Sequence, residues 1–280
     1  MVLLLDEAEY GGVTQHNMKP FRQFPQSSKP NIRFVLTDID DTLTINGRLP
    51  AEVFTAMEIL QKKGIRVIPI TGRPAGWCDH IARMWPVDGV VGENGAFYFR
   101  YDEDRKKMRR RYFASEKRRQ ENHRKLEALK HDILQKVPGS NISADQVYRE
   151  ADLAIDFCED VPSLTQNAIE EIVRLFTQAG AQAKISSIHV NGWFGDYDKL
   201  TMTKIFFEDV FELSLDLYKD RLVYVGDSPN DCPMFAFFPN SVGVANILDF
   251  KGRLDFEPAW ITTKPGGFGF AEMAEILLSR

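Results

Sequence analysis

The sequence predicts an α/β protein with a mostly parallel sheet, helices on both faces of that sheet, and an inserted α+β domain. Short apolar runs, which indicate buried strands, alternate with segments of helical spacing along the chain. This alternation is typical of parallel sheets, whose strands are connected through helices. Between Arg73 and Lys199 the chain is far longer than one such connection requires. The excess length predicts the inserted domain.

Two helices with clear ends follow the first two predicted strands. The segment 51–63 has Val53, Met57 and Leu60 at helical spacing and ends before Gly64, a typical C-terminal cap. The segment 74–85 begins with Pro74, which suits the first turn of a helix. We expect the other core helices at 199–207, 231–237 and 270–278. We expect the core strands at 32–36, 65–70, 87–91, 97–100, 221–225, 241–245 and 259–262.

Domain boundaries follow from this assignment. Residues 31–100 and 190–280 are predicted to form the core, and residues 101–189 the inserted domain, called the cap. Within the cap we expect helices from residue 116 onward and at 163–179, and strands at 147–157 and 183–190. Residues 1–30 contain glycine, proline and serine without a sustained period. They predict an N-terminal extension, either a partly ordered tail, which we favour, or a strap across the body.

The composition indicates a globular protein with a reduced, cytoplasmic setting. The 280 residues, 44% of them hydrophobic, suffice for two domains with their own cores. The net charge of −5 gives no general attraction to nucleic acid or membrane, and Glu and Gln interrupt the basic stretch 100–125, which favours a solvated face. Three scattered cysteines indicate neither a disulfide framework nor a zinc site. The apolar run 2–5 is too short for a signal peptide. The oligomeric state is not indicated.

Two aspartates at the end of the first predicted strand are the most informative feature. Asp38 and Asp40 follow the run 32–36, and they should point the same way because side chains alternate along an extended chain. Close carboxylates repel each other unless a cation lies between them, and Mg²⁺ prefers oxygen ligands of this kind. A carboxylate can also act as a nucleophile and form an aspartyl-phosphate. The alternative is a polar turn in which Asp and Thr merely cap the next segment of the chain.

Three further stretches favour the chemical interpretation. One predicted strand ends in Thr71-Gly72-Arg73, another runs into Gly226-Asp227-Ser228-Pro229-Asn230-Asp231, and Lys199 opens a helical segment between them. In a parallel sheet, groups that follow the strands gather at the carboxyl edge. Acid, hydroxyl, lysine and acid are the set that phosphoryl transfer requires: a nucleophile, a phosphate donor, a charge neutraliser and metal ligands.

In this order the stretches resemble the motifs of the haloacid dehalogenase-like (HAD) superfamily, specifically its Mg²⁺-dependent phosphatases. The family pattern is matched by Asp38, Asp40 and Thr42, then Thr71, then Lys199, and finally Gly226, Asp227, Asn230 and Asp231. A long insert between the second and third motifs is similar to the subfamily that includes sucrose-phosphate, trehalose-phosphate and mannosyl-phosphoglycerate phosphatases, Cof-type sugar phosphatases and phosphomannomutases. The chain departs from the pattern at Asp41 and Leu200, where relatives often carry Gly, and Lys204 offers a second lysine.

The resemblance implies a Rossmann-like core and a role for each matched residue. Asp38 would be the nucleophile and Asp40 the general acid and base, with Lys199 as the third catalytic group. Mg²⁺ would be held by Asp38, the backbone carbonyl of Asp40, and Asp227. The phosphate would be bound by Thr71, Gly72, Lys199 and Asn230, with support from Asp231, Thr42 and Arg73.

Substrate specificity would come from residues near the cap. Asn94 lies in the turn after the strand 87–91, and the segment 188–196 combines polar and aromatic groups near two glycines. Such groups suit a sugar site, so the candidates for a substrate cleft are Asn94, His189, Asn191 and Trp193. The alternative, which we favour slightly, is that Trp193 packs at the domain junction and His189 caps a strand end.

Three functions are compatible with these residues. A phosphatase acting on a small phosphorylated metabolite, with a sugar phosphate as the preferred class, is favoured. A phosphosugar mutase would use the same nucleophile and return the phosphoryl group to the sugar. A non-catalytic module that binds a phosphometabolite would need no nucleophile or acid, so the set of Asp38, Asp40, Lys199 and Asp227 argues against it.

Overall fold

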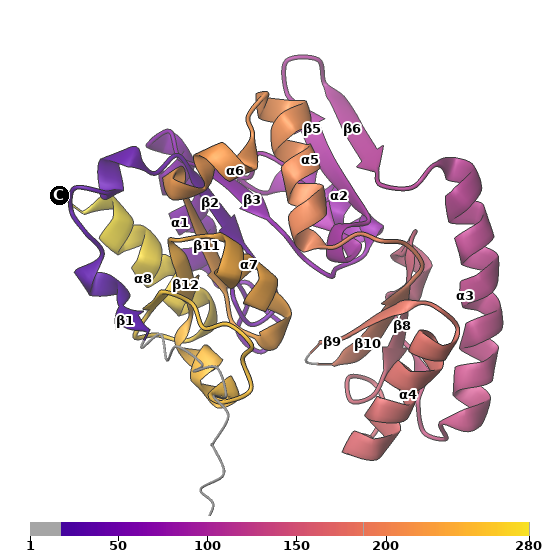
Figure 1. The fold of residues 1–280 in the computed structure, drawn as a ribbon. Coiled ribbons are helices and arrows are strands. Elements are labelled where there is room, and N and C mark those ends of the chain that lie inside the picture. Colours follow the sequence, from indigo (N-terminus) through magenta and orange to yellow (C-terminus); the bar gives the residue numbers. More distant parts are fainter. Residues whose placement is uncertain (1–17, 187, 280) are drawn as a thin grey trace, which may run out of the picture.

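The computed structural model describes residues 18–186 and 188–279, and it has the predicted architecture of a mostly parallel sheet with helices on both faces and an additional α+β unit (Figure 1). The predicted apolar run 2–5 lies outside the described residues. Six strands form the core sheet, and all of their pairings are parallel. Their order is β1 (Lys19–Pro20), β13 (Trp260–Ile261), β12 (Ser241–Gly243), β11 (Leu222–Gly226), β2 (Phe34–Thr37) and β3 (Arg66–Pro69).

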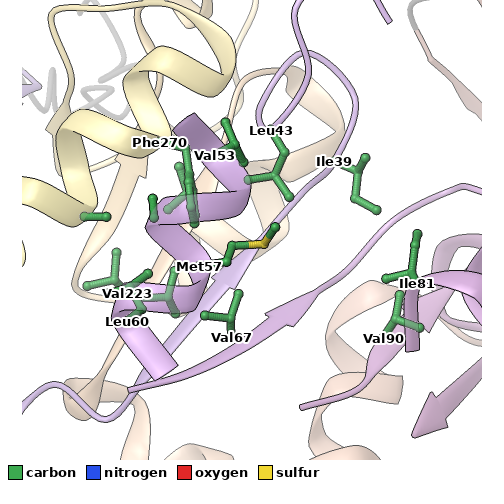
Figure 2. Packing of buried hydrophobic residues seen from close by; sticks show 14 of the residues in the cluster. Ile39, Leu43, Val53, Met57, Leu60, Val67, Ile81, Val90, Val223 and Phe270 are labelled. Atoms are coloured by element: carbon green, nitrogen blue, oxygen red, sulfur yellow. The ribbon is translucent and has the colours of Figure 1, made fainter. Parts of the chain in front are cut away.

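Alternating side chains of the core strands bury against two layers of helices. Val35, Val67 and Val223 face α1 (Ala51–Lys62) and α8 (Gly266–Leu278). Figure 2 shows Val53, Met57 and Leu60 of α1 packed together with Val67, Val223 and Phe270. The next residues along the same strands, Leu36, Ile68 and Tyr224, face α5 (Lys199–Phe211) and α7 (Cys232–Phe237). The short α6 (Leu215–Tyr218) follows α5. Because both faces are covered, the central strands read as nearly continuous apolar runs.

A second, antiparallel sheet extends the core beside α2 (Ala75–Met84). It consists of β4 (Val90–Gly92), β5 (Phe97–Asp102) and β6 (Lys107–Tyr112), and a parallel bridge from Ile70 to Val91 joins it to the end of β3. Strand β6 lies inside the range that we predicted for the cap, in the stretch interpreted as a solvated basic face. It pairs with β5 along its whole length, so this part of the chain belongs with the antiparallel sheet that extends the core and not with the cap.

The cap comprises the elements from α3 to β10 and has a core of its own. Its sheet is antiparallel and ordered β7 (Asn141–Ile142), β8 (Asp152–Asp156), β10 (His189–Trp193) and β9 (Gln182–Ile185), covered by α3 (Glu116–Lys136) and α4 (Gln166–Gln178). Two expectations were wrong in detail. Residues 146–148 form a 3-10 helix and only the end of 147–157 is a strand, whereas 183–190 spans parts of two antiparallel strands.

The described part of the N-terminal extension is built into the core. Lys19 and Pro20 pair with Trp260 and Ile261, and Phe21 and Phe24 are buried against the Trp260 ring. The Lys29 ammonium donates a hydrogen bond to the Ser279 hydroxyl at the other end of the described chain, at 2.9 Å. Residues 18–30 therefore form the strap that we considered, and the preference for a partly ordered tail was wrong for them. The sequence did not indicate this strap, because a strand of two residues is too short to show a periodic pattern.

In the part of the chain that the structure describes, Cys78, Cys158 and Cys232 form no disulfide. Among the residues that the structure describes, no helix combines the length and the apolar character needed to cross a membrane.

Truncation of Phe21 tests whether the N-terminal strap contributes to the core. Because its side chain is fully buried, Phe21→Ala should lower the free energy of unfolding by about 3–5 kcal/mol. Phe268→Ala, on the half-exposed side of α8, is the matched control and should cost far less. Urea unfolding of both variants gives the comparison, and equal losses would show that the strap is not part of the cooperative unit.

Candidate active site

The carboxyl ends of β2, β3 and β11 place three polar groups at one edge of the core sheet. Asp38 follows β2, Thr71 follows the end of β3 after Ile70, and Asp227 follows β11. The Asp38 amide donates to the Val225 carbonyl of β11 at 2.9 Å, which continues the ladder past the end of β2. All three side chains are nearly or fully buried. Parallel pairing of neighbouring strands thus brings together residues that are far apart in the sequence.

Lys199 is buried between two carboxylates. Its ammonium donates to Asp38 Oδ1 at 2.9 Å and to Asp231 Oδ1 at 3.0 Å. Burial opposes the positive charge, but Asp231 and Asp38 outweigh it and raise the pKa of Lys199 above its ordinary value. The alternative lysine, Lys204, is partly exposed and pairs with Asp216 instead of with the acids of this edge. Of these two lysines, Lys199 is therefore the one that lies among the acids of this edge.

Asp231 is already fully engaged by donors. Its Oδ1 also accepts from the Tyr224 hydroxyl at 2.6 Å, and its Oδ2 accepts from the backbone amides of Asp227 at 3.1 Å and Ser228 at 3.4 Å. Gly226 makes this close approach possible, because a Cβ there would lie 2.5 Å from Asp231 Oδ2. Asp231 therefore fixes Lys199 and the loop after β11.

Asp227 is oriented by side chains from two other loops. Its Oδ1 accepts from the Thr42 hydroxyl at 3.0 Å, and its Oδ2 accepts from the Asn246 amide at 3.3 Å. Asn246 also donates to the Asp41 carbonyl and accepts from the Gly266 amide, so it joins three segments around the site. We did not predict Asn246, since it follows β12 without a recognisable motif.

The acidic groups of this edge are arranged as a metal site would be. Oxygens of Asp38, Asp227 and Asp231 lie within 4.8 Å of one another. Burial, with the charge of neighbouring acids, raises the pKa of Asp38 to about 7 against the opposing effect of Lys199, and raises that of Asp227 well above its ordinary value. One ammonium does not neutralise three buried carboxylates. Because the donors are hard oxygens and Asp231 is occupied, the residues fit a divalent cation held by Asp38 and Asp227.

Asp40, two residues beyond Asp38, is held by Arg73. The Arg73 Nε is 3.0 Å from both carboxylate oxygens, and its Nη2 donates to Oδ1 at 2.6 Å. The Arg73 amide donates to the Thr71 hydroxyl at 3.0 Å, which shapes the Thr71–Gly72–Arg73 turn. The guanidinium also stacks over the Trp77 ring at 4.4 Å. Arg73 thus fixes the direction of the Asp40 carboxylate.

A cavity of about 890 Å³ lies between the core edge and the cap. Of the residues that we predicted, Asp38, Asp40, Gly72, Arg73, Asn94, His189, Asn191, Asp227 and Asn230 line it. Thr71, Lys199 and Asp231 lie behind this surface and are fully or nearly buried. Trp193 is not among the lining residues; it stacks on Tyr197 with ring centroids 5.8 Å apart, which agrees with the alternative of packing at the domain junction. His189 Nε2 lies 2.9 Å from Glu159 Oε2.

A buried carboxylate of the core, Glu93, joins the two domains. It accepts from the Ala75 amide of α2 at 2.9 Å and from three successive cap amides, those of Glu150, Ala151 and Asp152. Glu93 and Asn94 adopt the left-handed conformation, with φ of 41° and 54°, which turns both side chains toward the junction. We did not predict this role of Glu93, because no local pattern indicates that its partners lie in the cap.

The fold and the site define an α/β enzyme with an acid–lysine–acid site at the carboxyl edge of its sheet and a cap above it. Residues 35–211, more than half of the chain, match the family of haloacid dehalogenase-like hydrolases. The chain belongs to this family, so the predicted resemblance and the prediction of a hydrolytic enzyme are confirmed. No curated protein matches the chain significantly.

Solved structures share the whole fold at low identity. A protein from Thermoplasma acidophilum is 19% identical with a TM-score of 0.65, and the match covers 88% of this chain and 98% of that one. A haloacid dehalogenase-like hydrolase from Bacteroides thetaiotaomicron is 15% identical with a TM-score of 0.61, covering 87% and 98%. The sucrose-phosphatase from Synechocystis, solved with sucrose and phosphate, is 13% identical with a TM-score of 0.61, covering 88% and 99%.

The crowded carboxylates predict that stability depends on pH and on a divalent cation. In the metal-free protein the raised pKa of Asp38 means that the folded state holds a proton that the unfolded state has lost above about pH 4. The resulting stabilisation is full below that pH and is lost as pH rises through about 7. Between pH 5 and 8 the free energy of unfolding should fall by about 1–4 kcal/mol more in the wild type than in Asp38→Asn.

Chemical unfolding with a chelator, and then with Mg²⁺, measures both effects. At pH 8, Mg²⁺ at 100 times its dissociation constant should raise the free energy of unfolding of the wild type by about 3 kcal/mol. The increase should be smaller for Asp38→Asn and for Asp227→Asn. Equal pH slopes in wild type and Asp38→Asn, or no response to Mg²⁺, would contradict this account of the site.

Proposed function

We propose that this hydrolase is a Mg²⁺-dependent phosphatase that removes phosphate from a small metabolite, with a sugar phosphate as the preferred class, through an aspartyl-phosphate on Asp38. The observation that carries the proposal is the contact of Asp38 with Lys199, beside the acid Asp227 and within the same cavity as Asp40. A nucleophile, a cation, a metal ligand and a proton donor converge on one space, and hydrolysis of a phosphate ester requires these four.

The relatives support the substrate class. Three of the similar solved structures are described as a sucrose-phosphatase, a sugar phosphatase and a protein related to trehalose-6-phosphate phosphatase. The cavity lining agrees with such a substrate, because it offers the polar side chains of Asn94, His189, Asn191 and Lys184 above the strand ends. Hydrogen-bonding groups of this kind recognise hydroxyls.

A divalent cation would be held by Asp38, the backbone carbonyl of Asp40, and Asp227. When bound, it would neutralise the carboxylates and the charge of the phosphoryl oxygens. Thr42 and Asn246 already orient Asp227 for this role.

The first chemical step is attack by Asp38 Oδ on phosphorus. The bond from phosphorus to the ester oxygen breaks, an aspartyl-phosphate forms, and Asp40 gives its proton to the leaving oxygen. Lys199, with Thr71 and the Gly72 turn, stabilises the charge on the transferred group. In the second step Asp40 takes a proton from water, which attacks the same phosphorus and releases phosphate from Asp38.

A phosphosugar mutase would use the same first step and would transfer the phosphoryl group back to a second hydroxyl of the sugar. Because water is the acceptor in one reaction and a sugar in the other, the products separate the two functions. Free phosphate indicates the phosphatase; an isomerised phosphosugar with little free phosphate indicates the mutase.

Removal of the nucleophile tests the central step. Phosphate release from a panel of sugar phosphates and other small phosphomonoesters should require Mg²⁺ and should disappear in Asp38→Asn, because an amide cannot form the covalent intermediate. Asp104→Asn, an exposed change on the β5–β6 hairpin, is the control and should keep the full rate. An Asp38→Asn variant that is folded and still turns over near the wild-type rate would falsify the aspartyl-phosphate mechanism.

Replacement of the proton donor should slow the enzyme without abolishing it. Asp40→Asn keeps the shape and the Arg73 contact partner but cannot exchange a proton, so kcat should fall by about 10²–10⁴-fold. Steady-state kinetics on the best substrate of the panel provide the measurement. A change of less than a few fold would mean that another group carries the proton.

A further inference from the structure

An unbroken series of charged side chains runs from Asp40 into the cap. Arg73 holds Asp40 on one side, and its Nη1 lies 3.8 Å from Oδ2 of Asp145, which belongs to the loop between β7 and β8. Asp145 in turn accepts two hydrogen bonds from Arg149: Nε donates to Oδ1 at 2.9 Å, and Nη2 donates to Oδ2 at 3.1 Å. The core and the cap therefore share one alternating series of acid and base: Asp40, Arg73, Asp145 and Arg149.

Arg149 is not a substrate ligand in this arrangement. Its side chain is 2% exposed, and its remaining amino group donates to both oxygens of Asp152 and to the Gly72 carbonyl at 3.1 Å. A guanidinium with five donors has almost none left for a ligand. The Gly72 contact crosses from the cap to the turn that carries Thr71 and Arg73, so Arg149 acts on the core turn and on Asp145.

The hydrogen bonds that the two acids require do not by themselves account for this geometry. Arg149 donates to both Asp145 and Asp152, and Asn191 donates a further hydrogen bond to Asp152 at 3.1 Å, so both acids have donors without Arg73. Yet both ends of the network terminate on the Thr71–Gly72–Arg73 turn: Arg149 at the Gly72 carbonyl and Asp145 at the Arg73 guanidinium. Burial acts to raise the pKa of Asp145, but Arg149 outweighs it and keeps this pKa below its ordinary value, so Asp145 faces Arg73 as an anion.

We propose that Asp145 is a positioning residue of the reaction: it draws one side of the Arg73 guanidinium toward the cap and so fixes the direction in which Arg73 presents the Asp40 carboxylate, while Arg149 holds Asp145 in place. The inference rests on the proposed function, since it assigns Asp40 as the group that protonates the leaving oxygen. It gives the cap a part in the chemistry in addition to lining the cavity.

Loss of Asp145 should misdirect Asp40 without removing it. With no acid on the cap side, Arg73 retains a single carboxylate partner in the site and rotates toward it. A displacement of about 1 Å in a reacting group can cost roughly 10²-fold in rate. The fall in rate should appear only with substrates whose leaving oxygen must be protonated. Phosphoryl transfer from the ester of an acidic phenol, such as p-nitrophenyl phosphate, depends little on a general acid.

The experiment compares two substrates in the full-length protein with Mg²⁺. For Asp145→Asn, kcat on the best sugar or alkyl phosphate should fall roughly 10–100-fold with KM changed by less than about 3-fold, whereas kcat on p-nitrophenyl phosphate should change by less than about 3-fold. Asp132→Asn, an exposed acid of α3 paired with Lys136, is the matched control and should leave both rates unchanged.

A second variant keeps the test decisive if Asp145→Asn does not fold in a thermal unfolding assay. Arg149→Lys retains the positive charge but loses the paired hydrogen bonds to Asp145. Its kcat should fall more on the sugar or alkyl phosphate than on p-nitrophenyl phosphate, as for Asp145→Asn. Because the contact with the Gly72 carbonyl is also lost, we expect an additional fall in kcat that is the same for both substrates. Arg174→Lys, in the exposed α4 pair with Glu171, is its control.

Equal losses on both substrates, or none on either, would overturn the positioning role and leave Asp145 and Arg149 as structural residues. A wild-type protein that releases no phosphate from either substrate, with or without Mg²⁺, would instead overturn the proposed function, and this inference with it.

Discussion

The ion pairs of Lys199 are the contacts on which the rest of the site depends. Strand pairing brings Asp38 and Asp227 to the same edge, and the loop after β11 returns Asp231 to within reach of both. Buried carboxylates this close would repel one another and destabilise the edge. A single ammonium between Asp38 and Asp231 makes the arrangement tenable, and the donors around Asp231 prevent it from moving away. The incomplete neutralisation that remains would favour a divalent cation beside Asp38 and Asp227.

The same principle governs the domain junction. The core presents one buried carboxylate, Glu93, to a row of cap amides, and the cap presents one buried guanidinium, Arg149, to a core carbonyl. Each domain thus supplies a buried side chain that forms hydrogen bonds with the polar backbone of the other. The loop 145–152 is the segment of the cap that carries both contacts, and it is also the segment that meets the turn after β3. The geometry that we propose for catalysis and the contacts between the domains therefore depend on shared residues.

The sequence predicted the core well because its information is local. Apolar runs indicated β2, β3 and β11, helical spacing indicated α1 and α5, and motif residues at strand ends were brought together as parallel pairing requires. Contacts between distant segments left no such signal. Arg149, Asp145 and Asn246 are single polar residues in loops, and nothing in their neighbours indicates which atoms they meet across the fold. Strand β1 was not predicted for a related reason. It pairs with β13 over only two residues, which is too short for a recognisable sequence pattern.

That short strand has a consequence for the molecule in solution. Within residues 18–186 and 188–279, strand β1 is the last strand at its side of the core sheet, and the backbone groups of such an edge can pair with another chain. It consists of one lysine, whose ammonium lies 6.0 Å from the Trp260 ring, and one proline, which has no amide hydrogen to offer. After it the chain turns at once into the buried Phe21. A sheet that ends in this way offers a neighbouring molecule few backbone groups with which to pair. Parallel sheets depend on long-range pairings that form slowly, so an unprotected edge is exposed to other molecules during folding. The N-terminal strap therefore disfavours edge-to-edge aggregation.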